Sequence, residues 1–452
     1  MFHALGAGRL PAKTRQAEAG LGSWGALSSA PQGPGSPQAS TLDSGVRILT
    51  EAMPTAHSVS IGLWVPVGSR DEASDTLGAT HFLEHLLFKG TKTLTAVDIA
   101  ESFDRVGGEA NALTAKEYTC YHARLLARDL PMAVRVLTEM LTRAALAQAD
   151  FETERSVILE ELAMAADDPV DVAGEAFAAA VFGDSPLARP IGGTPETIKA
   201  QSRDGVEAYY RRHYRPDNLV GTVAGAVEHA GLISLLEAGL DAGGWSLAAK
   251  GAASPAPRRA DGQGREPESG EGRRAIARPT EQAHVILGCP GLMVNDPRRY
   301  VLAALGTVLG GGMSSRLFQE IRERRGLAYS TYALTELHSD AGAFGLYAGC
   351  APAAVDQVSE LMASIWADLA KNGPRQGELE RAKGQISGGT VLALEDPQAR
   401  MNRLGLAETV TGRWLTVEEV LAKIDAVTVD QVRELAQELA ARPRQHVIVT
   451  PA

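Results

Sequence analysis

Two stretches of this chain, far apart in the sequence, follow the same pattern. Residues 59–62 read Val-Ser-Ile-Gly, and residues 285–288, which lie 226 positions later, read Val-Ile-Leu-Gly. At the same separation, Glu-Thr-Glu-Arg at 152–155 corresponds to Glu-Leu-Glu-Arg at 378–381. A constant separation over this distance indicates a duplicated unit of roughly two hundred residues, which is larger than the repeat of a solenoid protein. We therefore expect two similar domains.

Within each copy, segments with a strand pattern occur together with amphipathic helical segments. Residues 59–65 and 219–224 alternate or run apolar as strands do, whereas 133–143 and 206–212 have one apolar helical face. The pattern predicts an α+β protein with two homologous α/β sandwich domains from an internal duplication. Each domain should have a mainly antiparallel sheet with helices on one side. The 452 residues, of which 44% are hydrophobic, suffice for two cores.

Composition places the expected domain boundaries. Residues 1–42 are rich in Gly, Ser, Ala and Pro and predict a disordered N-terminal extension. Residues 43–248 should form the first domain, and 282–452 the second. The low-order stretch at 249–281 is expected to be the linker between them. Neither a secretory signal nor an apolar run near 20 residues is present, so we expect no membrane span.

The pentapeptide His-Phe-Leu-Glu-His at 81–85 indicates a metal-binding site. On a helix, His81 and His85 lie on one face and can direct both imidazoles at one metal ion. Two histidines, a third ligand from elsewhere and a position kept for water are the layout of a catalytic zinc site. Glu84 is placed to take the proton of that water, and the order H-x-x-E-H is the inverzincin motif. The alternative is a buried structural helix, on which three partly desolvated polar groups would cost stability.

A second helix, predicted to begin with Asp150 as its N-cap, offers the third ligand. Glu154 and Glu161 are seven positions apart and share a face, whereas Glu160 points away from it. Such a pair suits one metal ligand and one carboxylate that orients the site. An ordinary solvated acidic face explains the spacing equally well. Spacing alone therefore leaves the ligand role, and the choice between Glu160 and Glu161, open.

Two further motifs occur in the order found in a known family. Residues 107–114, Gly-Gly-Glu-Ala-Asn-Ala-Leu-Thr, resemble its G-G-x-x-N-A-x-T strand, and 322–329, Arg-Glu-Arg-Arg-Gly-Leu-Ala-Tyr, resemble its R-x-x-x-G-L-A-Y segment. With the pentapeptide, they make the chain resemble the pitrilysin and mitochondrial processing peptidase family of inverted zinc peptidases, in a bacterial-type form. The resemblance runs from about Ser44 to the C-terminus.

The resemblance implies roles for the residues of the first copy. His81, His85 and Glu161 are implied as the ligands of one Zn²⁺ per chain. Glu84 is implied as the general base, and Glu154 as the acid that orients a ligand. The activity implied is that of a zinc metalloendopeptidase that hydrolyses peptides or unfolded polypeptide segments. The alternative is a non-catalytic or partner-dependent subunit of a processing-peptidase-like complex.

Four substrate-binding residues are implied by the resemblance alone. Asn111 and Ala112 lie in the segment that, in the family, adds the substrate as an extra strand through main-chain hydrogen bonds. Arg322 and Tyr329 are implied to hold the substrate carbonyls near the zinc. Without the resemblance, Asn111 and Ala112 would be interpreted as part of a glycine-rich turn into a strand. Arg322 would be one charge on a basic helix face, and Tyr329 an aromatic residue of a strand.

The second copy lacks the residues of the predicted metal site. At the 226-residue separation, the positions of His81, Glu84, His85 and Glu161 are occupied by other residues, namely Thr307, Gly310, Gly311 and Ser387. One half is therefore expected to be catalytic. The family resembled here closes four such domains around a chamber, and this chain supplies two. The resemblance implies a homodimer, or a heterodimer with a related chain.

Net charge and cysteine content narrow the possible partners and the cellular compartment. The net charge of −11 disfavours nucleic acid as a partner. The three cysteines, Cys120, Cys289 and Cys350, have no C-x-x-C spacing, which fits a reducing compartment. We expect a bacterial cytoplasmic protein, with the mitochondrial matrix as the alternative.

Overall fold

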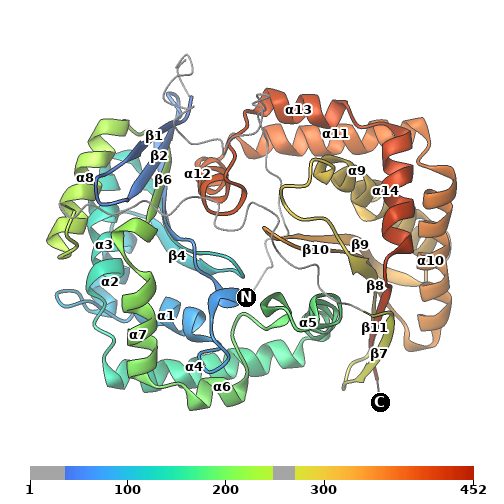
Figure 1. The fold of residues 1–452 in the computed structure, drawn as a ribbon, viewed down its shortest axis with the longest axis horizontal. Helices are drawn as coiled ribbons and strands as arrows, with labels where there is room; N and C mark the ends of the chain where they lie inside the picture. Colours follow the sequence, from blue (N-terminus) through green and yellow to red (C-terminus); the bar gives the residue numbers. More distant parts are fainter. Residues whose placement is uncertain (1–35, 248–269, 452) are drawn as a thin grey trace.

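The chain folds into two halves that lie side by side, each built on its own sheet (Figure 1). The structure, a computed structural model, describes residues 36–247 and 270–451. The predicted two α/β domains with mainly antiparallel sheets are confirmed. Most of the predicted N-terminal extension and the first part of the predicted linker lie outside the described residues.

The first sheet has six strands in the order β1-β2-β6-β3-β5-β4. Its neighbours are antiparallel except for the parallel pair β2 and β6. The strands are β1 (Gln38–Thr41), β2 (Arg47–Ala52), β3 (Ser58–Val65), β4 (Glu109–Thr114), β5 (Thr119–Leu126) and β6 (Val220–Gly225).

The second sheet has five strands in the order β7-β11-β8-β10-β9. It too contains one parallel pair, β7 and β11, and is otherwise antiparallel. The strands are β7 (Gly272–Ala277), β8 (Ala283–Pro290), β9 (Ala328–Leu337), β10 (Gly342–Cys350) and β11 (Gln445–Thr450).

Each sheet buries one face beneath helices of its own half. Ile61 and Leu63 of β3 belong to the core of the first half, and Val285 and Leu287 of β8 belong to that of the second. The helices of the first half are α1 (Ala79–Leu87), α2 (Ala96–Asp104), α3 (Leu130–Arg143), α4 (Gln148–Asp167), α5 (Pro169–Phe182), α6 (Pro195–Ala200), α7 (Arg203–His213) and α8 (His229–Ala242). Those of the second half are α9 (Arg299–Gly310), α10 (Val355–Asn372), α11 (Gln376–Ala393), α12 (Pro397–Leu406), α13 (Val417–Asp425) and α14 (Val429–Ala441).

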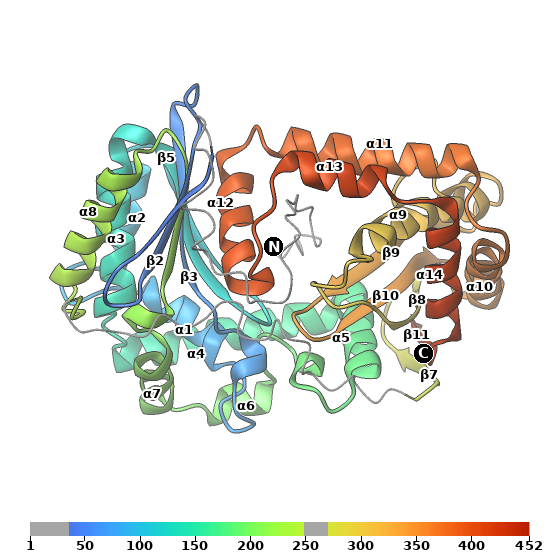
Figure 2. The same cartoon turned by 45° about the horizontal axis from the view of Figure 1, so that its top comes forward.

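Each half also gives one helix to the sheet of the other half. Helix α12 packs on β3 and β6 of the first sheet, and α5 packs on β8 and β11 of the second (Figure 2). Trp64 of β3 clusters with Met401 of α12, while the neighbouring strand residues Ile61 and Leu63 face the first core. Because successive strand residues point to opposite faces, the exchanged helix covers the face that the home helices leave open.

A glycine in each central strand makes room for the exchanged helix. A Cβ at Gly62 in β3 would lie 2.5 Å from the sulfur of Met401. A Cβ at Gly288 in β8, the position 226 residues later, would lie 2.5 Å from the ring of Phe177 in α5 and 2.5 Å from the carbonyl oxygen of Phe344. The matching glycines of the two copies therefore serve the same packing purpose.

Three expectations from the sequence need correction. Part of the predicted linker, residues 272–277, forms strand β7 on the edge of the second sheet. Residues 38–41, predicted to be disordered, form β1 and pair with β2. Helix α4 begins at Gln148, after Ala147 at its N-cap, so Asp150 lies in its first turn and does not cap it. Backbone pairing with a neighbouring strand stabilises β1 and β7, and neither segment has the apolar run of a buried strand.

Among the helices of the described residues, none combines the length and the apolar character that a membrane crossing requires.

We predict that Gly288→Ala lowers the free energy of unfolding by about 1–3 kcal/mol, because the added methyl group overpacks the contact with α5. The matched control is Gly174→Ala within α5, where a Cβ would meet nothing within 4 Å. It should raise stability by about 0.5–1 kcal/mol, as alanine does in a helix interior. Urea unfolding of both variants measures this, and an unchanged Gly288→Ala transition would contradict the packing argument.

Candidate metal centre

The predicted ligands come together because α1 packs against α4. Phe82 of α1 stacks on Phe151 of α4, with 4.3 Å between ring centroids, and both side chains are fully buried. Gly78 at the N-cap of α1 has φ +89°, a left-handed conformation that glycine adopts without strain. The apolar face of α1 thus fixes the direction in which its two histidines point.

Three ligand-type atoms converge between these helices. The Nε2 atoms of His81 and His85 lie 3.3 Å apart. Oε2 of Glu161 lies 3.7 Å from Nε2 of His81 and 3.4 Å from Nε2 of His85. Within the described residues, this is the group of three His, Cys, Asp or Glu side chains that offers donors close enough for one metal ion. Glu160, the neighbour of Glu161, is exposed and outside the group.

The spacing of these atoms fits a tetrahedral zinc site. Zinc binds nitrogen and carboxylate oxygen at about 2.0–2.2 Å, so two donors at tetrahedral corners lie about 3.3–3.6 Å apart. The three separations found here are 3.3, 3.4 and 3.7 Å. Two imidazoles and one carboxylate are also the donor set of catalytic zinc sites with a fourth position open. The residues present therefore fit the ion.

Glu154 orients one of the two histidines. Its Oε2 lies 2.9 Å from Nδ1 of His85, and its Oε1 lies 2.7 Å from Nζ of Lys89. A hydrogen bond at Nδ1 leaves Nε2 of His85 directed at the converging group, which is the usual arrangement of metal-binding histidines. Glu154 is 1% exposed, and the cation of Lys89 balances its buried charge.

Glu84 lies beside the converging group without belonging to it. Thr114 of β4 donates its hydroxyl hydrogen to Oε2 of Glu84. Burial raises the pKa of Glu84 above its usual value, and the hydrogen bond from Thr114 partly opposes this rise. A carboxylate with a raised pKa is suited to accept and return a proton near neutral pH.

The two histidines have opposite pKa shifts. Burial, followed by the nearby His85, lowers the pKa of His81 to about 4, so its imidazole is neutral at physiological pH. Burial alone would also lower the pKa of His85, but the carboxylates of Glu161 and Glu154 raise it overall. A neutral imidazole presents the lone pair that a metal requires. The imidazole of His81 can therefore bind a metal as it stands, whereas that of His85 lies between the carboxylates of Glu154 and Glu161.

Strand β4 places Asn111 and Ala112 at the edge of the first sheet. In the described part of the chain, β4 pairs with β5 alone, so its outer edge has no strand neighbour. The strand contacts α1, and its Thr114 reaches Glu84. The side chain of Asn111 accepts a hydrogen bond from the backbone N–H of Ala112 at 2.8 Å. The open edge therefore runs beside the candidate site.

The structure does not bring Arg322 and Tyr329 to the metal-site residues of the same chain. Both lie in the second half, where the guanidinium of Arg322 stacks 4.6 Å from the ring centroid of Tyr329. Figure 1 shows β9, which carries Tyr329, in the opposite half from α1. In the part of the chain that the structure describes, neither residue makes a hydrogen bond or ion pair with the converging group. Tyr329 is 76% exposed, whereas Arg322 is partly buried.

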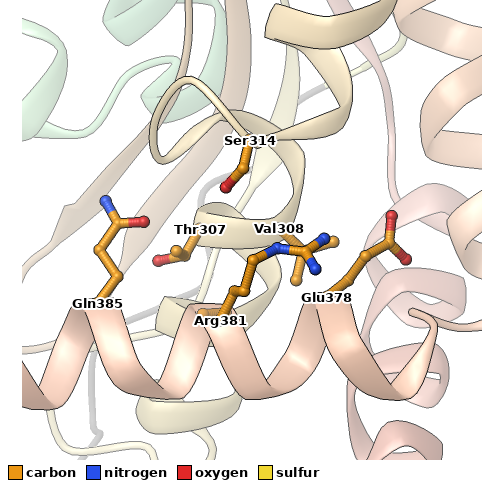
Figure 3. Close-up of a pocket in the computed structure, with 7 residues that line it drawn as sticks. Thr307, Val308, Ser314, Glu378, Arg381 and Gln385 are labelled. Carbon is orange, nitrogen blue, oxygen red and sulfur yellow. The ribbon is translucent and has the colours of Figure 1, made fainter.

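The second half has a pocket between α9 and the counterpart of α4, but its lining offers no metal donor set. Thr307, which corresponds to His81, lines this pocket together with Ser314, Arg381 and Gln385. Figure 3 shows Arg381 and Gln385 extending from α11 on the side of Thr307, with the guanidinium of Arg381 turned toward Glu378. The side-chain amide of Gln385 donates to the carbonyl oxygen of Gly311. The second half therefore keeps the helix pair, with Thr307 and Gly311 at the positions of the two histidines.

Sequence reasoning assigned no role to Thr114 or Lys89. Thr114 ends the glycine-rich motif of 107–114, and Lys89 follows the helix that carries the histidines. Their partners, Glu84 and Glu154, lie 30 and 65 residues away in the sequence. Only the packing of β4 and α4 against α1 reveals these contacts.

Comparison with known proteins matches two segments of the chain to peptidase domains. Residues 47–195 match the family described as Insulinase (Peptidase family M16), and residues 201–386 match the Peptidase M16 inactive domain. An uncharacterized zinc protease of Streptomyces coelicolor is 47% identical over 92% of this chain and 90% of its own length. Relatives of the same description from Mycobacterium tuberculosis and Bacillus subtilis are 42% and 37% identical over 92% and 91% of this chain, and 93% and 98% of their own lengths.

Solved structures share the fold. A peptidase M16 inactive domain from Pseudomonas fluorescens superposes with a TM-score of 0.82 at 19% identity, covering 92% of this chain and 98% of its own. A protease from Helicobacter pylori superposes with a TM-score of 0.82 at 21% identity, covering 92% and 99%. At such identities, the likeness establishes the two-domain architecture alone.

We predict that Glu161→Ala weakens zinc binding by at least about 100-fold, more than the loss of a residue that only orients a ligand. The neighbouring Glu160→Ala removes the same charge from the exposed face of α4 and should leave zinc affinity within about twofold of wild type. Competition with a chromophoric chelator measures both affinities. Loss of zinc from Glu160→Ala with retention in Glu161→Ala would reverse the assignment.

Proposed function

The chain belongs to peptidase family M16, and from that premise we propose that it is a zinc-dependent endopeptidase acting on peptides and unfolded polypeptide segments. Zinc is its cofactor. One observation carries the proposal: the donor atoms of His81, His85 and Glu161 converge at separations of 3.3–3.7 Å beside the carboxylate of Glu84. We assign the first three residues as the zinc ligands and Glu154 as the acid that orients His85.

Glu84 is the proposed general base. Zinc, when bound, supplies the Lewis acidity that amide hydrolysis requires at neutral pH. The hydroxyl of Thr114 holds Oε2 of Glu84, which leaves Oε1 to take a proton from the attacking water. The same oxygen then passes that proton to the departing amine. The raised pKa of Glu84 supports this cycle, because it makes the carboxylate a stronger base toward the proton of the water.

The edge of β4 is the proposed binding surface for the substrate backbone. An extended peptide that pairs with an open strand edge gains main-chain hydrogen bonds, which do not depend on its side chains. Asn111 and Ala112 lie on this edge, and Thr114 at its end contacts Glu84. A peptide paired with the open edge of β4 would therefore extend toward Glu84, the proposed base. Such binding requires an extended chain, which favours unfolded segments over folded proteins.

We propose a homodimer in which Arg322 and Tyr329 act on the substrate at the partner's site. This is supported by their place in the half opposite α1 and by the exposure of Tyr329, on which Arg322 stacks. A guanidinium and a phenol hydroxyl suit contacts to carbonyl oxygens, and twofold pairing is the commonest way for identical chains to associate.

The second candidate is a subunit that depends on a related partner chain for activity. The pairing of one metal-binding half with one half that lacks the donor set favours it, because the second half needs another role. Peptide-library cleavage by the purified chain, with and without a chelator, distinguishes the candidates. Chelator-sensitive cleavage by the isolated chain supports the endopeptidase, whereas cleavage that begins only on adding a related chain supports the subunit.

We place the protein in the bacterial cytoplasm. The relatives described above come from bacteria. The three cysteines, Cys120, Cys289 and Cys350, are free and buried, which agrees with a reducing compartment.

We predict that Glu84→Gln retains zinc and lowers kcat by about 10²- to 10⁴-fold, the usual cost of losing a general base. Glu101→Gln, an exposed change on α2, is the control and should keep wild-type kcat. Zinc content and peptide turnover are measured on the same preparations. Unchanged turnover by zinc-replete Glu84→Gln would remove Glu84 from the mechanism.

We predict that mixing Glu84→Gln with Arg322→Ala restores activity that neither variant has alone. In a dimer with shared sites, one mixed pair contains an intact metal site facing an intact Arg322. Random pairing makes half of the dimers mixed, each with one such site, so the mixture should reach about a quarter of wild-type activity. Light scattering at the assay concentration gives the state of association. A fully active monomer would exclude the shared site.

A further inference from the structure

A short segment of the first half lies between the zinc helix and the second half. We call residues 69–72 the bridge segment; it comprises the 3₁₀ turn η2 (Ser69–Asp71) and Glu72. The N–H of Ser69 donates to the carbonyl oxygen of Ala115 at 3.1 Å, and that of Arg70 donates to Lys116 at 3.0 Å. The bridge segment is thereby held against the turn that joins β4 to β5.

At one end of the bridge segment, Glu72 holds the start of α1. Its carboxylate accepts from the N–H of Gly78 at 2.8 Å and from the N–H of Thr80 at 2.7 Å. The N-cap of α1 is itself a glycine without a capping side chain, so Glu72 supplies the acceptors for free N–H groups of the first turn. Glu72 is 4% exposed, and Thr80 immediately precedes His81.

At the other end, Arg70 reaches into the second half. Its Nη1 and Nη2 donate to Oδ1 and Oδ2 of Asp340 at 2.7 and 2.8 Å, a two-pronged contact. Nη1 also donates to Oε1 of Glu117 at 2.7 Å. Glu117 in turn accepts a hydrogen bond from the backbone N–H of Ser339 at 3.0 Å. Asp340 and Ser339 form the turn between β9 and β10.

These contacts make a continuous path from the second half to a zinc ligand. Asp340 binds Arg70, the bridge segment carries Glu72, and Glu72 binds the turn that begins α1. A shift of the β9–β10 turn therefore pulls on the segment that sets the position of His81. The zinc donors tolerate only small shifts, because the ligand distances of a zinc site vary by about 0.2 Å.

We propose that Glu72 and Arg70 are positioning residues of the zinc site, through which the placement of the second half fixes the first turn of α1. This rests on the proposed zinc ligation by His81, His85 and Glu161. The second half would then do more than bind substrate, because it would also complete the geometry of the metal site in the first half.

A double-mutant cycle on zinc affinity tests the path, with Glu72→Gln, Asp340→Asn and the double variant. The two carboxylates do not touch each other, so independent effects would multiply. In Glu72→Gln, the side-chain NH₂ replaces one carboxylate oxygen, so the N–H of either Gly78 or Thr80 loses its acceptor and faces another donor. This change should weaken zinc binding about 10- to 100-fold. Asp340→Asn should weaken it about 2- to 30-fold. The double variant should bind zinc no worse than Glu72→Gln alone, because the path is already cut.

The control is Glu438→Gln, which breaks the ion pairs of Glu438 with Arg298 and Arg442 elsewhere in the second half. It should not change zinc affinity, alone or combined with Glu72→Gln. The thermal midpoint of the zinc-free protein is recorded for every variant. A merely structural role would lower that midpoint and leave the affinity of the folded protein unchanged. If Glu72→Gln does not fold, Glu72→Asp, which keeps the charge on a shorter side chain, takes its place.

Effects on zinc affinity that multiply, or an Asp340→Asn variant with wild-type affinity, would overturn the proposal. Neither result bears on peptide cleavage by the wild-type chain. Conversely, a wild-type chain that binds zinc but cleaves no peptide would refute the proposed function and leave the cycle on zinc affinity valid. Zinc affinity and turnover are therefore measured separately on each variant.

Discussion

The contact between α1 and α4 is the interaction on which the candidate site depends. The stacked rings of Phe82 and Phe151 form its buried centre, and replacing such a phenylalanine by alanine typically costs about 3–5 kcal/mol. His81 and His85 come from one helix and Glu161 from the other, so their separations of 3.3–3.7 Å hold only in this register. A slide of one helical turn, about 5.4 Å, would take the carboxylate out of reach. Hydrophobic packing, together with the contacts of Glu154 with His85 and Lys89, thus sets the metal geometry.

The exchange of helices ties this register to the whole molecule. Helix α4 ends at Asp167, and α5 follows at Pro169 after Asp168, whose side chain accepts from the N–H of Val170 at 2.7 Å and caps the new helix. Because α5 packs on the second sheet, the helix that carries Glu161 is anchored at one end in the opposite half. Separating the halves would therefore strain a ligand helix. In the second copy, α11 leads in the same way into α12, which packs on the first sheet.

The sequence predicted what depends on local periodicity and spacing, and missed what depends on which surfaces meet. The duplicated strands follow from alternation, and the shared face of His81 and His85 follows from helical spacing. The choice of Glu161 as third ligand needed the family resemblance, because spacing alone left it open. The exchange of α5 and α12 does not, because an amphipathic helix has the same pattern whichever sheet it covers. Strand β7 lies on a sheet edge and is mostly exposed, so it carries no apolar signal. Glu72 could not be recognised for a related reason: a buried carboxylate six residues before the N-cap of a helix looks like a loop acid until its N–H partners are placed.

Electrostatics explains why the helix pair survives in both copies while the metal donors do not. In the first half, burial lowers the pKa of His81 to about 4 and raises that of Glu84, so both groups are disfavoured in their charged forms. Such desolvated groups cost stability unless an ion or a partner satisfies them. The second copy has Thr307 at the position of His81 and a nearby glutamine, Gln385, that bonds to a backbone carbonyl. The hydroxyl of Thr307 donates to the carbonyl oxygen of Ala303, so backbone carbonyls satisfy both side chains without a metal. The second half retains the helix packing without the metal donors, so its fold carries a lower desolvation cost. It can still position α1, the zinc helix of the first half.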